Sequence, residues 1–204
     1  MKKIFLLYTS LLLSIFSFAQ VNLQSLVKPG TKLIYAVETN EQKYEFIITV
    51  KTLVPAVVFD WEMTDRANNN GTITHTATAM MAANTMYNNF APGPKTLDDN
   101  TLSLWLSKNI FAGLMKPGKG IMMSMNIGDR PKKMGTYAED NEELKILVNG
   151  EKETVEEELA KELNGEGTPV GNDVFFTFNN SAKMPVILRM RNDFYIVLKE
   201  IKTK

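Results

Sequence analysis

Residues 43–53 read KYEFIITVKTL, and this stretch contains the pattern that decides the fold. Its large apolar residues Tyr44, Phe46, Ile48 and Val50 fall at every second position. Successive side chains of a β-strand point to opposite faces, so this spacing places all four on one face. Aromatic and β-branched residues are also enriched in strands. The stretch is therefore predicted to be a strand with one buried face.

The same alternation recurs before and after this stretch, in residues 32–39 (KLIYAVET) and 57–65 (VVFDWEMTD). The connections between the three are short, which favours antiparallel neighbours because a parallel crossover needs about a dozen residues or more. Further strands are expected at 72–79, 121–127, 132–138, 144–148, 174–179, 185–190 and 194–202. The predicted fold class is mainly β: a curved antiparallel sheet or open barrel.

The dipeptide Asn149-Gly150 is the strongest short hairpin signal in the chain. Both residues tolerate the positive φ angles of a tight two-residue turn, so residues 144–148 should pair with a strand at 153–155. The following stretch, 156–163 (EEELAKEL), is rich in helix-forming residues and could instead form one or two helical turns.

The spacing of apolar residues changes between residues 99 and 115. Positions i, i+3, i+4 and i+8 form a helical stripe of Leu102, Trp105, Leu106 and Ile110. Asp99 or Asn100 can cap the start of such a helix, and Gly113 can end it. We expect one helix over about residues 99–115, packed with its stripe on the apolar face of the sheet.

Residues 1–19 (MKKIFLLYTSLLLSIFSFA) have the features of a signal peptide. Lys2 and Lys3 precede an apolar run, and the small residues Ser17 and Ala19 stand at the positions that a signal peptidase requires. Cleavage would leave residues 20–204 as one exported domain, in the periplasm or outside the cell. No later apolar run is long enough for a membrane span.

The composition limits the chemistry of the chain. Lys plus Arg and Asp plus Glu are equal in number, so no long-range charge attracts the chain to nucleic acid, and no nucleic-acid partner is expected. The chain has no Cys and one His, which leaves no zinc cluster and no thiol nucleophile. Oxygen ligands for calcium occur at 65–68 and 98–100 without the spacing of a known loop. No metal or cofactor is predicted.

Two sets of residues invite a catalytic interpretation. His75, the one histidine, lies among threonines in a predicted strand with no nucleophile motif nearby, so we interpret it as a packed residue. Asp60 and Glu62 share a strand face and could form the carboxylate pair of a hydrolase, although such pairs on an outward face are normally solvated. The sequence therefore predicts a non-catalytic protein, with a carboxylate-dependent hydrolase as an alternative.

Methionine is unusually concentrated in one region. Eight of the 12 methionines lie between residues 80 and 134. Thioether side chains can fill an ordinary core, line an adaptable pocket for apolar ligands, or bind Cu(I), for which Met123 and Met125 are suitably spaced. All three interpretations stay open on the sequence alone.

The ligand-binding residues that we predict are Trp61, Trp105, Met123 and Met125, in the concave face of the sheet. The expected partner is an apolar or amphipathic small molecule or a lipid. The alternative is an assembly module that pairs with another protein through an exposed sheet edge. The oligomeric state is not predicted.

The C-terminal stretch 173–201 (DVFFTFNNSAKMPVILRMRNDFYIVLKEI) resembles the closing strands of a poorly characterised family of secreted bacterial β proteins. The similarity extends to Lys28-Pro29-Gly30, to 104–107 (LWLS) and to 147–150 (LVNG). The resemblance implies a strongly curved sheet or half-barrel over a helix, as in periplasmic carriers. It implies no catalytic residue.

Overall fold

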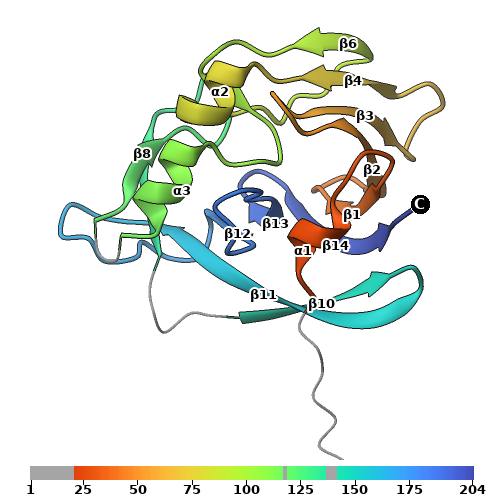
Figure 1. Ribbon diagram of the computed structural model, residues 1–204. Helices are drawn as coiled ribbons and strands as arrows, with labels where there is room; N and C mark the ends of the chain where they lie inside the picture. Colours follow the sequence, from red (N-terminus) through yellow and green to blue (C-terminus); the bar gives the residue numbers. More distant parts are fainter. Residues whose placement is uncertain (1–20, 117–118, 137–141) are drawn as a thin grey trace, which may run out of the picture.

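The computed structural model describes residues 21–116, 119–136 and 142–204. The predicted signal peptide lies outside the described residues. Within them the fold is mainly β with three short helices, which confirms the predicted fold class (Figure 1). The strands form a closed five-stranded barrel and two extensions of it.

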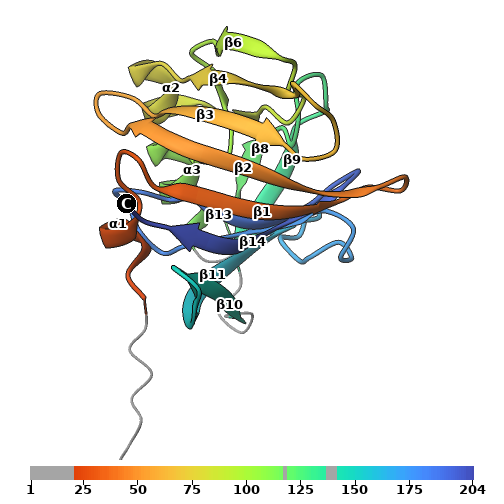
Figure 2. The same cartoon turned by 90° about the vertical axis from the view of Figure 1, so that its right-hand side faces the viewer.

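The first extension is a twisted antiparallel layer made by the first half of the chain. Strands β1 (Lys32–Glu38), β2 (Lys43–Thr52), β3 (Val58–Met63) and β4 (Asn70–Thr74) pair in chain order. Strand β6 (Gly93–Thr96) adds to β4 in parallel and forms the outer edge. Figure 2 shows these strands face on as one layer.

The barrel is made by the second half of the chain. Strands β11 (Glu151–Glu162), β12 (Phe175–Phe178), β13 (Ile187–Arg191) and β14 (Tyr195–Lys202) pair in sequence. Strand β10 (Glu142–Val148) pairs with β11 and, in parallel, with β14, which closes the ring. Because β14 also pairs with β1, the barrel and the first layer share one continuous sheet.

Four short strands complete the sheet system. Strand β9 (Lys132–Thr136) pairs with β11, and β8 (Ile121–Met123) pairs with β9. Strands β5 (Thr85–Met86) and β7 (Thr101–Leu102) form a separate parallel pair.

Helix α3 (Lys108–Leu114) is the predicted helix, but it begins later than residue 99. Ser107 caps it, because its hydroxyl accepts a hydrogen bond from the Ile110 N–H at 3.0 Å. The chain before Ser107 is not helical: residues 101–102 form strand β7, and Trp105 forms a β-bridge with Val186. The four apolar residues of the predicted stripe are all buried. Leu102 and Trp105, however, are held by pairing with distant segments of the chain and not by a helix.

Helix α2 (Ala77–Ala82) replaces the second half of the strand predicted at 72–79. Strand β4 ends at Thr74, and the hydroxyl of Thr76 accepts a hydrogen bond from the Ala79 N–H at 3.0 Å. Helices α2 and α3 cover the concave side of the first layer (Figures 1 and 2). The third helix, α1 (Leu23–Leu26), precedes β1.

The hairpin at Asn149-Gly150 is confirmed. Both residues have positive φ angles, 54° and 89°, as a type I′ turn requires. Strand β11 continues from this turn to Glu162, so the helical alternative for 156–163 is wrong.

The two-residue alternation also predicts the core correctly. Phe46, Ile48 and Val50 are buried on one face of β2, whereas Ile47 and Thr49 on the other face are partly exposed. One apolar cluster extends from the first layer into the barrel.

Candidate functional site

Three turns meet at one end of the sheet. Antiparallel pairing brings the β1–β2 turn (39–42), the β3–β4 turn (64–69) and the β13–β14 turn (192–194) to the same end. They lie at the right-hand end of the sheet in Figure 2. Residues 88–90, in the connection from β5 to β6, reach the same place. These segments surround an apolar cavity.

The cavity has a volume of about 110 Å³ and a buried apolar floor. The floor is formed by side chains from β1, β2, β13 and β14 and from the segment before α3, namely Val37, Phe46, Met190, Ile196 and Leu104. Since most of these residues stand on paired strands, the floor is part of the rigid sheet.

The walls are partly exposed and contain both apolar and polar groups. They are formed by Thr39, Tyr44, Met63, Asn88, Phe90 and Phe194. Phe90 is fixed by other rings: its centroid lies 4.6 Å from that of Phe46, 5.3 Å from that of Trp61 and 5.4 Å from that of Tyr87. Contacts between aromatic rings favour specific relative orientations, so these three neighbours fix the orientation of the Phe90 ring in the wall.

Leu104 has a strained backbone at the floor of the cavity. Its φ is 59°, in the left-handed region that residues with a side chain rarely adopt. The Ile187 N–H donates a hydrogen bond to the Leu104 carbonyl at 2.8 Å, which holds this conformation. Backbone strain of this kind is common at binding and active sites, where the surrounding structure maintains it.

Tyr44 and Asn88 provide polar groups in the walls. Burial, and then the negative charge of Asp65, raise the pKa of Tyr44 above its usual value, so its hydroxyl is a hydrogen-bond donor at neutral pH. The side-chain N–H of Asn88 donates to the Met125 carbonyl at 2.7 Å. Its amide oxygen accepts no hydrogen bond from the described part of the chain and can serve a ligand.

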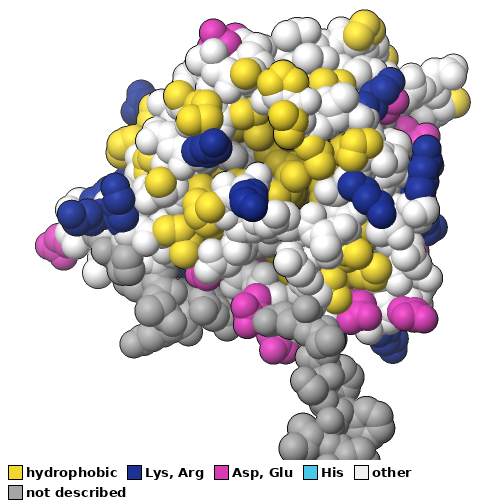
Figure 3. All heavy atoms as spheres, viewed as in Figure 1, with side chains coloured by type: hydrophobic (Ala, Val, Ile, Leu, Met, Phe, Trp, Pro, Cys, Tyr) yellow, Lys and Arg dark blue, Asp and Glu magenta, His cyan; other side chains and the backbone are white. Residues whose placement is uncertain are grey.

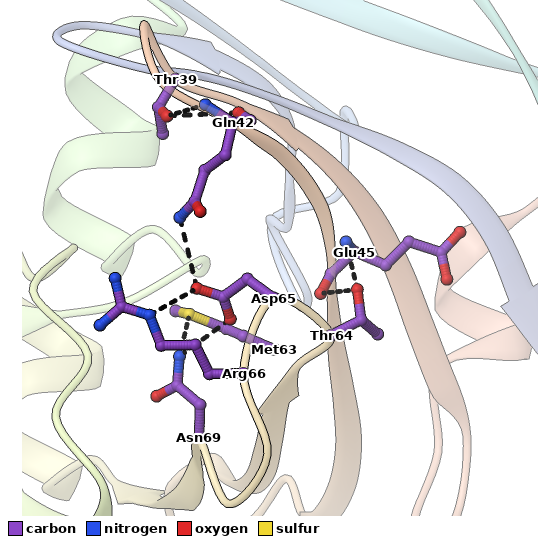
Figure 4. Close-up of polar contacts among 8 residues, drawn as sticks. All are labelled: Thr39, Gln42, Glu45, Met63, Thr64, Asp65, Arg66 and Asn69. Atoms are coloured by element: carbon purple, nitrogen blue, oxygen red, sulfur yellow. Dashed lines mark hydrogen bonds and ion pairs between the residues drawn. The ribbon is translucent and has the colours of Figure 1, made fainter.

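A cluster of polar side chains around Asp65 lies beside the cavity (Figure 4). The Asp65 carboxylate accepts hydrogen bonds from Gln42 at 3.3 Å and from Asn69 at 3.1 Å, and Nε of Arg66 lies 3.8 Å from it. The same Asn69 nitrogen lies 3.3 Å from the sulfur of Met63, a wall residue. The cluster thus ties the β1–β2 turn to the β3–β4 turn.

The four ligand-binding residues predicted from the sequence lie in the core. Trp61, Trp105, Met123 and Met125 are each at most 2% exposed, and none of them lines this cavity. The indole N–H of Trp105 contacts the sulfur of Met184 at 3.3 Å. Trp61 instead lines the open hollow over Asp60 and Glu62, and the methionines at the cavity are Met63 and Met190.

Some of the residues that line the cavity could be identified from the sequence as the apolar face of predicted strands. Val37, Tyr44 and Phe46 belong to the alternating pattern of β1 and β2. Asn88 and Phe90 come from residues 80–96, a segment without clear periodicity, so nothing local connected them with those strands.

His75 is a packed residue, as predicted. It is 2% exposed, its Nδ1 lies 2.9 Å from the Val57 carbonyl, and the Ser103 N–H donates to its Nε2 at 3.0 Å. Burial lowers its pKa to about 4, although the Val57 contact acts in the opposite direction. Both ring nitrogens are engaged, so neither is available as a general base.

Asp60 and Glu62 face outward, over an open hollow of about 480 Å³. Asp60 lies 3.2 Å from the Lys51 ammonium and accepts a hydrogen bond from Thr72 at 2.6 Å. Glu62 lies 4.0 Å from Lys32. Both carboxylates are about half exposed and paired with lysines, which is the arrangement of a solvated sheet face.

The outer strands of the sheet have features that discourage pairing with another chain. Strand β6 is four residues long and contains Pro94 and Lys95. Beyond β8, Ser124 is hydrogen-bonded to the chain at Asn84 and Met86, each at 2.9 Å. Short, proline-containing or covered edges are typical of sheets that avoid edge-to-edge association.

A second apolar surface lies at the opposite end of the sheet. That end carries the helices and the β2–β3 turn and faces the viewer in Figure 1. Figure 3 shows apolar side chains gathered near the middle of this face, with lysine and arginine side chains around them. Val54, in the β2–β3 turn, is 84% exposed, so apolar surface is open to water there.

Comparison with protein-family models, curated proteins and solved structures finds no match for this chain. The described residues contain no helix long and apolar enough to cross a membrane. They also contain no group of three or more His, Asp or Glu side chains suited to a metal ion.

Proposed function

We propose that this chain is a non-catalytic exported binding protein that holds a small apolar ligand, or the apolar end of an amphipathic one, in the cavity at the β1–β2 end. One observation supports this most directly: a partly open apolar cavity with a buried floor and a few polar wall groups. Sites for small molecules are typically concave and mostly apolar, with a few polar groups that fix orientation.

The volume limits the size of the bound group. An apolar cavity of about 150 Å³ is large enough to hold benzene. At about 110 Å³, this cavity suits a slightly smaller group, such as a branched alkyl group of about four carbons. A longer amphipathic molecule would place only one end inside.

The scaffold favours binding without large rearrangement. The floor residues Val37, Phe46 and Ile196 stand on strands with neighbours on both sides. A preformed site avoids the entropy cost of ordering loops when the ligand binds. The buried His75 and the lysine-paired Asp60 and Glu62 offer no comparable support for catalysis.

Methionine methyl resonances can test the proposal directly. Met63 and Met190 line the cavity, whereas Met123 is buried, does not line it and serves as an internal control. Titration with neohexanol, a small alcohol that ends in a tert-butyl group, should shift the Met63 and Met190 resonances and leave that of Met123 in place. Absence of any shift at Met63 and Met190 with millimolar neohexanol would overturn the proposal.

A filled cavity gives an independent control. In Val37→Phe the larger ring should occupy the cavity and abolish the neohexanol shifts at Met190. Val197→Phe is the matched variant, because Val197 stands on the neighbouring strand and does not line the cavity. It should bind like the parent protein. Equal binding by the two variants would contradict the assigned location.

Export is a separate part of the proposal and rests on residues 1–19. The mature protein, isolated from outside the cytoplasm, should begin at Gln20. N-terminal sequencing and intact mass measure this, and an uncleaved chain would contradict it.

A further inference from the structure

The cavity has an uncharged lining and a negatively charged side chain behind its wall. None of its lining residues is charged. Asp65 is connected to the wall through Asn69. The side-chain nitrogen of Asn69 contacts both the sulfur of the wall residue Met63 and the Asp65 carboxylate. The influence of Asp65 on the pKa of Tyr44 places the same charge near a second wall residue.

The Asp65 carboxylate is poorly compensated for a buried charge. Its side chain is 8% exposed, and its two hydrogen-bond donors, the amides of Gln42 and Asn69, are neutral. Among the described residues, the cation paired with it is Arg66, whose Nε lies 3.8 Å away and whose side chain is 77% exposed. Because a buried charge is costly unless it is well paired, this site can accommodate a further positive charge.

The basic side chains at this end have other partners. Lys43 pairs with Glu38 at 3.0 Å on the outward face, and the Arg191 guanidinium stacks over the Tyr195 ring at 5.3 Å. An anionic head group in the cavity would therefore meet no basic lining residue. This argues against a fatty acid as the ligand.

The aromatic content of the site favours a cation. Tyr44, Phe46, Phe90 and Phe194 all contribute rings to the lining. An ammonium group held against aromatic faces is attracted by their negative quadrupole, most strongly where water is excluded. Alkyl groups on the nitrogen would also gain contact with the apolar floor.

On the basis of the proposed function, we infer that the ligand is a small organic cation: an ammonium group with short alkyl substituents, bound against the rings of Phe46 and Phe90 beside the Asp65 carboxylate. Arg66 competes for the same carboxylate in the free protein. The Tyr44 hydroxyl and the Asn88 amide oxygen are available to a polar substituent.

Three probes of one shape but different charge test this inference. Choline carries a quaternary nitrogen, and neohexanol has carbon in place of that nitrogen. The third probe, tert-butylacetate, is the anion of tert-butylacetic acid and has a carboxylate on the same branched skeleton. Shifts of the Met63 and Met190 methyl resonances, at fixed ionic strength, give the three dissociation constants. Choline should bind about tenfold more tightly than neohexanol, and tert-butylacetate the most weakly.

Two variants of the polar cluster should change choline binding in opposite directions. Asp65→Asn removes the charge with little change of shape and should weaken choline binding severalfold, while the attraction of the aromatic rings remains. Arg66→Gln removes the competing cation and should strengthen it severalfold. Glu41→Gln, at an exposed position in the β1–β2 turn, removes one negative charge outside the cluster and should leave binding unchanged.

The outcomes separate the inference from the proposed function. If neohexanol or tert-butylacetate binds as tightly as choline, the cation inference fails while the cavity is still a binding site. If no probe shifts Met63 or Met190, the proposed function fails with it. If Asp65→Asn is misfolded by circular dichroism, Arg66→Gln decides: weaker or unchanged choline binding overturns the inference.

Discussion

At the scale of single residues, His75 shows how strongly burial decides chemistry. Its ring packs against those of Phe59 and Trp105, with centroids 5.8 Å and 6.2 Å away, and its two nitrogens are hydrogen-bonded to backbone groups. A charged imidazolium would lose the hydrogen bond that Ser103 donates to Nε2. The neutral ring is therefore part of the structure, and protonation opposes folding.

We expect a pH dependence of stability from this residue. Its pKa is about 4 in the folded protein against an ordinary value of 6.5, so between these values the unfolded chain binds a proton that the folded chain does not. Stability is fully present above pH 6.5 and falls as the pH falls toward 4, by about 3 kcal/mol in total. Urea unfolding at pH 7, 6 and 5 measures this.

The control for this prediction is His75→Gln, which cannot titrate. It should be less stable at pH 7 but should have a shallower pH dependence between 6.5 and 5, where few carboxylates titrate. As the chain has one histidine, no other imidazole can mask the difference. Identical pH profiles for the two proteins would show that His75 is not the cause.

At the scale of elements, the strands could be predicted because their signal is local. The alternation in β1, β2 and β3 reflects one buried face, and each strand was found within one or two residues of its bounds. Helix α2, where a strand was predicted, and the start of α3 were missed because single hydroxyl caps, Thr76 and Ser107, set where these helices begin. The apolar spacing ran through both boundaries without a change.

Strand β11 was partly missed for a different reason. Its acidic second half favours a helix by local propensity, but it pairs with β12 on one side and β9 on the other. The carboxylate of Glu157 is buried, accepts a hydrogen bond from Thr177 at 2.6 Å and is paired with Arg189. These partners stand on other strands, so the local sequence could not indicate them.

The contact between β3, β4 and β6 allows a sharp test at this scale. A Cβ on Gly71 would lie 2.2 Å from the Gly93 carbonyl oxygen and 2.8 Å from Nε1 of Trp61. Gly71→Ala should therefore force the strands apart and lower the free energy of unfolding by about 3 kcal/mol. Chemical denaturation measures this change.

Gly165→Ala is the matched control for that substitution. A Cβ on Gly165 would meet no atom within 4 Å, so the change should be close to neutral. If both variants are equally stable, β3, β4 and β6 do not approach each other as closely as described.

At the scale of the whole molecule, the candidate site could not be found from residue types. Tryptophan and methionine marked Trp61, Trp105, Met123 and Met125, but large apolar side chains fill the core first. The cavity lies where three turns and residues 88–90 meet, and which end of a curved sheet is left open depends on contacts far apart in the sequence. The apolar lining of β1 and β2 was predictable, and its opening to solvent was not.

Closure of the barrel also depends on a distant contact. Strand β10 pairs with β14 over Leu147 and Val148, a short parallel contact. Beyond it, the Asn149 N–H donates to the Ile201 carbonyl at 2.9 Å. The Asn149 side chain donates to the Thr203 hydroxyl and accepts from the Thr203 N–H, each at 2.9 Å. The turn residue thus fastens the hairpin to the end of β14.

Asn149 has two roles: it adopts the positive φ of the turn, and its side chain binds Thr203. We expect Asn149→Gly and Asn149→Ala to separate these roles. Glycine keeps the positive φ of the turn and loses the two side-chain hydrogen bonds, which should lower the free energy of unfolding by about 1 kcal/mol. Alanine also resists the left-handed conformation, at a further cost of about 1–2 kcal/mol. In both variants the Thr203 amide, released from Asn149, should exchange with solvent faster. Unchanged Thr203 exchange together with unchanged stability would mean that the backbone pairing of β10 with β14 closes the barrel without this side chain.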